Sequence, residues 1–230
     1  PLVSITKKLT LHLGCLALFV SGIAAAQAPT SPQLIRAGRL LKEVPGLIAA
    51  QDYSLALSRL DSIIPVFESA VKVTPADKGA LEQALFLVGI CHLDSKSYDP
   101  AIEAFTKQLT RFPNGAMMPF ARLLIGEAHL YQSDWPAIIR SVSPVLNHQR
   151  LNFDQRSMAY QLVAEALFQL EEWEKALEFL RWVFKNTKDV EVKRLSVSQM
   201  SVCLVKLQHF KSLYKLIPYV HRSSAKYDIG

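Results

Sequence analysis

The 230-residue sequence predicts an all-α fold of stacked antiparallel helix pairs. An aromatic residue recurs at intervals of 37, 38 and 37 residues, at Tyr98, Trp135, Trp173 and Phe210. The residue nine places before each aromatic is small, namely Gly89, Gly126, Ala164 and Ser201. A small side chain at a fixed offset lets two helices cross closely. No stretch alternates polar and apolar residues between hairpin signals, so we expect no strands.

The stretch over residues 89–113 shows one unit most completely. Ala101 and Phe105 follow Tyr98 by three and seven residues, and Pro113 follows it by fifteen. This pattern resembles the tetratricopeptide repeat family, where a small residue admits close packing, an aromatic fills the gap and proline ends the second helix. The resemblance covers roughly residues 80–215. It implies a right-handed α-solenoid of about four repeats, and it adds Ala176, three residues after Trp173, to the repeat-packing residues.

The sequence divides into four parts. We expect a signal peptide at residues 1–26 and a degenerate N-terminal helical cap unit at 27–79. That unit centres on Tyr53, 45 residues before Tyr98, and has Val44 where the small residue should stand. Residues 80–222 then hold the repeats, and 223–230 form a tail. An atypical terminal unit is common at the end of a solenoid.

Residues that typically begin or break helices divide the first half of the chain into helical segments. Ser31 and Pro32 can cap and begin a first helix, which Pro45 and Gly46 should interrupt. Residues 54–73 have apolar side chains at a spacing of three to four, as in a helix with one buried face. Pro65 should kink that helix.

Residues suited to capping a helix recur in the later units. Thr74, Pro75 and Asp77 should start the helix that carries Gly89. Further positions suited to capping a helix are Ser97, Asp134, Asp154 and Asp189. Pro144 lies inside the second helix of its unit and should bend it.

The N-terminal segment has the layout of a secretory signal peptide. Lys7 and Lys8 precede an uncharged run over residues 9–23, and small residues follow. We expect cleavage after Ala26 and export to the periplasm or cell envelope. An uncleaved membrane anchor is the alternative, because the uncharged stretch continues to Arg36. Lipidation of Cys15 is disfavoured, since the residue three places earlier is a histidine.

The sequence has no recognisable catalytic or metal motif, so we predict no enzyme activity, no catalytic residue, no metal and no cofactor. It lacks a nucleophile elbow, a phosphate-binding loop, HExxH and CxxC. Glu127 and His129 are two residues apart and should point to different sides of a helix. Cys91 and Cys203 hold equivalent places three units apart, too far for a disulfide, and should be small buried hydrophobes.

In the family, the first helices of the units line a concave groove. The corresponding positions lie 15, 12, 8, 5 and 4 residues before each aromatic. From them we take as groove residues Phe86, Ile90, Leu93, Phe120, Leu123, Glu127, Tyr131, Gln161, Glu165 and Phe168. The same offsets before Phe210 give Leu195, Ser198, Val202, Val205 and Lys206. A mostly apolar groove suits an amphipathic helix or an extended peptide from a protein partner.

The resemblance is strongest to bacterial periplasmic and cell-envelope proteins of this repeat class. It implies a non-catalytic interaction scaffold or adaptor, working as part of an envelope complex. The alternatives are a helical scaffold domain of a larger cell-wall (peptidoglycan) enzyme and a membrane-anchored assembly subunit.

The C-terminal end is basic. Residues 192–227 contain seven Lys or Arg and no Asp or Glu, in a chain of formal net charge +6. This distribution leaves open a contact with an anionic membrane or an acidic partner, beside a simply solvated last helix pair. We expect no nucleic-acid partner, because an exported protein does not meet one.

Overall fold

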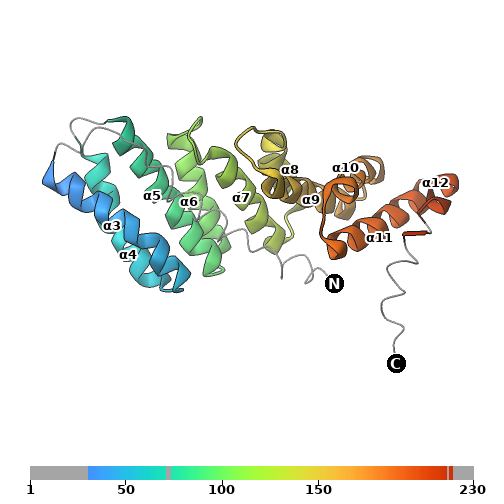
Figure 1. Cartoon of the computed structure of the whole chain (residues 1–230), viewed down its shortest axis with the longest axis horizontal. Helices are drawn as coiled ribbons and strands as arrows, with labels where there is room; N and C mark the ends of the chain where they lie inside the picture. The colour runs from blue at the N-terminus through green and yellow to red at the C-terminus, as the bar shows by residue number, and fades with distance from the viewer. Residues whose placement is uncertain (1–30, 71–73, 217, 220–230) are drawn as a thin grey trace, which may run out of the picture. The chain divides into compact units, whose positions relative to one another are not determined.

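The computed structural model describes residues 31–70, 74–216 and 218–219, and these residues form helices without a strand (Figure 1). The prediction of an all-α fold is therefore confirmed for this part of the chain. The predicted signal peptide, the lipidation question at Cys15 and the tail at 223–230 lie outside it. Contacts between backbone positions divide the chain into two compact units, one ending at Ala128 and the other beginning at His129.

The described residues of the first unit form four complete helices, each packed on the next along the chain. They are α3 (Pro32–Ala49), α4 (Tyr53–Glu68), α5 (Pro75–Asp94) and α6 (Tyr98–Arg111), coloured blue to green in Figure 1. The beginning of α7 (Met118–Gln132) adds Ala121, Leu124 and Ala128 to the same hydrophobic core. Because α5 packs against α3, α4 and α6, it lies at the centre of this unit.

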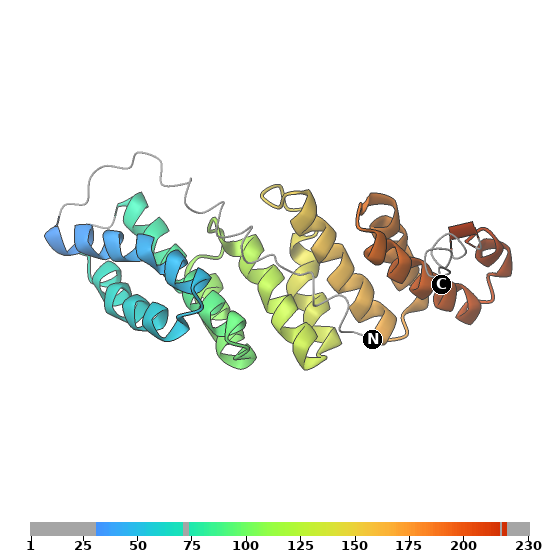
Figure 2. The same cartoon turned by 60° about the horizontal axis from the view of Figure 1, so that its bottom comes forward.

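The second unit also consists of paired helices, and Figure 2 shows its elements from another side. After the end of α7 come α8 (Trp135–Val142), a short 3-10 turn (Ser143–Val145), α9 (Phe153–Gln169), α10 (Trp173–Asn186), α11 (Val190–Lys206) and α12 (Phe210–Tyr214). Within this unit α9 packs against α8 and α10, and α11 packs against α10 and α12.

Five turns of the same geometry set the period of the repeat. Each marker aromatic is the first residue of the second helix of a pair, at Tyr53, Tyr98, Trp135, Trp173 and Phe210. Two residues before each lies a left-handed residue with φ between 57° and 62°, namely Gln51, Lys96, Ser133, Glu171 and Gln208. In each turn two backbone N–H groups bond back to the last turn of the preceding helix, as in a Schellman motif. The predicted repeat register is thus confirmed, and it includes the N-terminal unit around Tyr53.

None of these five left-handed residues is a glycine, which leads to a prediction. Lys96→Gly should raise the free energy of unfolding by about 0.5–1 kcal/mol. Left-handed φ costs an L-residue roughly 1–2 kcal/mol, and the greater chain entropy of glycine offsets about half of that gain. The matched control is Lys107→Gly at an exposed position within α6, which should lose about 1 kcal/mol. Urea midpoints measure both, and a loss of stability in Lys96→Gly would contradict the turn geometry.

Most of the predicted helix starts are confirmed. Ser31, Thr74, Asp134 and Asp189 each accept a hydrogen bond from the first turn of the following helix. Thr74 and Asp77 bond to each other's backbone in a reciprocal capping box. Ser97 holds the capping position of α6 without a side-chain bond. The cap of α9 is Asn152 rather than Asp154, which lies in the first turn.

The prolines depart from prediction in two places. Pro45 does not interrupt the first helix, because α3 continues through it to Ala49 and keeps Leu41, Val44 and Ile48 on one buried face. Burial of three such side chains, at about 1.5–3 kcal/mol each, outweighs the roughly 3 kcal/mol cost of a proline inside a helix. Pro144 ends the second helix of its unit instead of bending it, since α8 stops at Val142 and the 3-10 turn follows.

The end of α4 and the boundary between the cap unit and the repeats differ from the prediction by a few residues. The helix α4 continues through Pro65 and ends at Glu68 rather than near residue 73. The helix α5 begins at Pro75, so the division placed after residue 79 falls inside it.

Candidate functional site

The predicted groove residues are less exposed than the family pattern implies. Six of the ten are buried: Phe86, Ile90, Leu93, Leu123, Glu127 and Glu165. Phe120, Gln161 and Phe168 are half-buried, and Tyr131 is 40% exposed. A buried side chain offers no surface to a partner, so the expected open groove through the middle units is wrong at those six positions. Partner binding by the other four stays a prediction.

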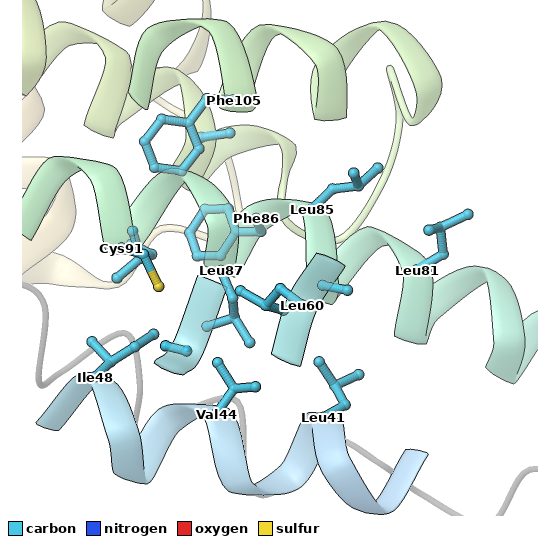
Figure 3. Close-up of a cluster of buried hydrophobic side chains, with 14 of the residues drawn as sticks. Leu41, Val44, Ile48, Leu60, Leu81, Leu85, Phe86, Leu87, Cys91 and Phe105 are labelled. Atoms are coloured by element: carbon cyan, nitrogen blue, oxygen red, sulfur yellow. The ribbon is translucent and has the colours of Figure 1, made fainter. Parts of the chain in front are cut away.

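The packing of α5 explains the burial of Phe86. Its ring lies against Phe105 of α6, with ring centroids 5.4 Å apart, and Figure 3 shows both within the core of the first unit. The repeat pattern assigns one face of α5 to its partner helix and leaves the opposite face free. However, α3 and α4 also pack on this helix, and apolar residues surround it. A helix that is apolar on all sides is a buried helix.

Several of the predicted repeat-packing residues are buried or half-buried, but Phe210, which should fill the gap between its two helices, is 53% exposed. A Cβ atom added at Gly89 would lie 2.7 Å from Cζ of Phe105, so only glycine fits beside that ring. The alanines at 101, 164 and 176 and Gly126 are buried. The hydroxyl of Ser201 donates to the carbonyl of Val197, four residues earlier in α11. Pro113 lies two residues beyond the end of α6.

Glu127 is a buried carboxyl group without a hydrogen-bond partner on either oxygen. Burial raises the pKa of Glu127 to about 8, and the negative charge of Asp94 adds to the effect. Glu165 holds the equivalent position in the next repeat and is satisfied: it accepts from Gln199 Nε2 at 2.6 Å and from Gln169 Nε2 at 2.8 Å. The two glutamates therefore share a repeat position but not an environment.

Glu82 is a buried residue that sequence reasoning missed. Its carboxylate accepts from the backbone N–H groups of Ala116 and Met117, at 3.0 and 2.7 Å, and from Gln108 Nε2 at 3.1 Å. These bonds hold the loop between α6 and α7 against α5, where a Cβ at Gly115 would come within 2.9 Å of Glu82 Oε2. This role is structural, and the only sequence signal was an acidic residue within the apolar part of the helix, between Leu81 and Leu93.

Two exposed apolar side chains lie at the corresponding positions of the last repeat. Leu195, Ser198, Val202 and Val205 lie along one face of α11, because they recur at three- and four-residue intervals. We call these four residues the α11 stripe. Val202 is 39% exposed and Val205 is 50% exposed. Beside the stripe, the Lys206 ammonium lies 5.6 Å from the ring centre of Trp173, which also contacts Phe168 edge to face.

The cysteines follow the prediction. Cys91 and Cys203 are free and buried. Burial is the main cause that raises the pKa of Cys91 to about 12 and that of Cys203 to about 11. A thiol of high pKa is a poor nucleophile, so these residues act as small apolar side chains.

Neither a metal cluster nor a membrane-spanning helix is present in the described residues. No group of three or more His, Cys, Asp or Glu converges there as a metal site would require. Across the same residues, no helix combines the length and the apolar character needed to cross a bilayer.

No protein-family model and no curated protein matches this sequence. Several solved structures are similar in fold. MamA from Desulfovibrio magneticus RS-1 aligns with a TM-score of 0.62 at 15% identity, covering 87% of this chain and 100% of that one. MamA of strain AMB-1 gives 0.62 at 12% identity, covering 85% and 95%. A structure of nearly identical TPR-like repeats from Podosopora anserina gives 0.59 at 11% identity, covering 88% and 100%.

At these identities the similarity concerns the fold. It agrees with the five equivalent turns and the paired helices described above. The chain therefore has the all-α, tetratricopeptide-like helical-repeat fold.

Proposed function

We propose that this protein is a non-catalytic interaction scaffold of the bacterial cell envelope that binds a helix or peptide of a partner protein. The observation that supports it is the α11 stripe, where two large apolar side chains, Val202 and Val205, stand exposed on one helix face. Neighbouring apolar side chains on a surface are typical of protein-binding sites. The envelope location is supported by the signal-like pattern of residues 1–26.

The binding site differs from the one first expected. Phe86 is a core residue, so Phe86→Ala would cost about 3–5 kcal/mol and would confuse unfolding with lost binding. The α11 stripe can be altered without opening the core, since exposed positions tolerate substitution within about 0.5 kcal/mol. It is therefore the better place to test binding.

The test is capture of envelope proteins by the purified chain. Val202→Glu combined with Val205→Glu should abolish retention of the partner, because both substitutions put charge into an apolar contact. The matched control is Ile35→Glu with Leu55→Glu, two exposed apolar residues of the first unit, and it should retain the partner. Thermal unfolding of each variant shows that the fold is kept. Equal capture by both double variants would remove the α11 stripe as the site, and no capture by the wild type would contradict the function.

A further inference from the structure

The second unit shows which part of a repeat is covered by the next one. Gln199 of α11 donates to Glu165 of α9 at 2.6 Å, and both side chains are buried. Glu165 lies eight residues before Trp173, so the first helix of the following repeat covers this position. Val202 lies eight residues before Phe210 and is therefore the same position of the last repeat. Unlike Glu165, it is exposed.

A second position of the repeat is also more exposed in α11 than in the earlier repeats. Leu93 and Leu130 lie five residues before their marker aromatics and are buried, and Phe168 is half-buried. Val205 is their equivalent in the last repeat and is half exposed. The unit of α11 and α12 therefore has exposed apolar residues at two positions that are buried or half-buried in the repeats before it.

Most of the charged residues beside the α11 stripe are basic, and Glu191, four residues before Leu195, is the one acidic residue of α11. Lys206 follows Val205 directly, Lys211 lies in α12 and Lys215 follows the end of that helix, and all three are exposed. Arg194 lies at the other end of the stripe and bonds to Glu191 at 3.1 Å. No Asp or Glu occurs over residues 192–227. A surface of this kind attracts an acidic partner and disfavours a basic one.

We propose that an acidic amphipathic helix of a partner protein docks on α11 in the place that the first helix of a further repeat would take. Its apolar face packs on Val202 and Val205, and its carboxylates lie near Lys206. This inference rests on the proposed function and adds the chemical class of the partner. An amphipathic helix laid on an apolar helix face is a recurrent mode of peptide recognition.

Two synthetic helical peptides of about 18 residues, or five turns, test the proposal. Both carry leucine at helical intervals of three and four, and the remaining positions are mainly Glu in one and Lys in the other. Fluorescence anisotropy with the full chain should show binding of the Glu peptide at least about tenfold tighter than the Lys peptide, and binding should weaken as salt increases. Val202→Glu with Val205→Glu should weaken the Glu peptide about tenfold or more, while Ile35→Glu with Leu55→Glu leaves it unchanged.

Other outcomes overturn the proposal. These are no binding of the Glu peptide, equal binding of both peptides, or binding indifferent to the α11 substitutions. Analytical sedimentation of the wild type and the α11 double variant tests a further outcome. If the wild type self-associates and the variant does not, a second copy of this chain binds the α11 stripe and the proposal is wrong. If the Glu peptide does not bind while capture of envelope proteins depends on Val202 and Val205, the proposal of an acidic helix is wrong and the scaffold function stands. If capture fails as well, the function itself is wrong.

Discussion

Glu127→Gln should stabilise the protein strongly at pH 9 and leave its stability at pH 5 almost unchanged. The carboxyl group is 1% exposed, and burial, followed by the charge of Asp94, raises its pKa from 4.5 to about 8. Burial raises the pKa of Tyr98, and the negative charge of Glu127 adds to the effect. The native state therefore holds the Glu127 proton more tightly than the unfolded chain does. Its favourable contribution is complete below pH 4.5 and is lost as pH rises to about 8.

A pKa shift of this size lowers the free energy of unfolding of the wild type by at most about 5 kcal/mol at pH 9. Urea unfolding of wild type and Glu127→Gln from pH 5 to 9 should show curves that meet at low pH and separate with increasing pH. The matched control is Glu165→Gln, because Glu165 holds the same repeat position but accepts two amide hydrogen bonds. That variant should lose stability at pH 9. Parallel pH profiles for wild type and Glu127→Gln would contradict an ionisable group without a partner at this site.

Gly89→Ala should destabilise the protein by about 1–3 kcal/mol, although alanine favours helices more than glycine does. The new Cβ would meet the ring of Phe105, which is fully buried and cannot move away freely. Gly38→Ala in α3 is the control: nothing lies within 4 Å of its added Cβ, so it should gain about 0.5–1 kcal/mol.

A second substitution tests whether the added methyl group clashes with the ring of Phe105. Phe105→Leu should cost less in the Gly89→Ala background than in the wild type, because the smaller side chain leaves room for the methyl group. Urea unfolding of the four proteins gives this coupling. Gly89→Ala as stable as Gly38→Ala would mean that Gly89 is not a close-packing residue.

The repeat register was predictable from sequence because it depends on local sterics. Four of the five pairs have a small residue at the crossing, and all five begin their second helix with an aromatic residue, so the pattern is visible in the spacing, as at Gly89 and Tyr98. The turns left no such trace. Lys96 and Glu171 adopt the left-handed conformation that favours glycine, because backbone bonds to the preceding helix enforce it.

Exposure of the predicted groove was not predictable in the same way, since it depends on how many neighbours each helix has. Phe86 fits the groove pattern, yet α5 has neighbours on several sides and buries it. The apolar residues all around α5 were a signal in the sequence that outweighs the family pattern. Val202 and Val205 fit the same pattern and remain exposed, because the described residues place no further helix pair over α11.

The most direct test of the scaffold account is photo-crosslinking in the cell. A photoreactive phenylalanine analogue replaces Val205 in the full chain, and in a second strain it replaces Leu55 of the first unit, which is similarly exposed. The account predicts a discrete adduct with another envelope protein at position 205 and none at position 55. An adduct at position 55 alone, or none at either position, would contradict a partner-binding role for the last repeat.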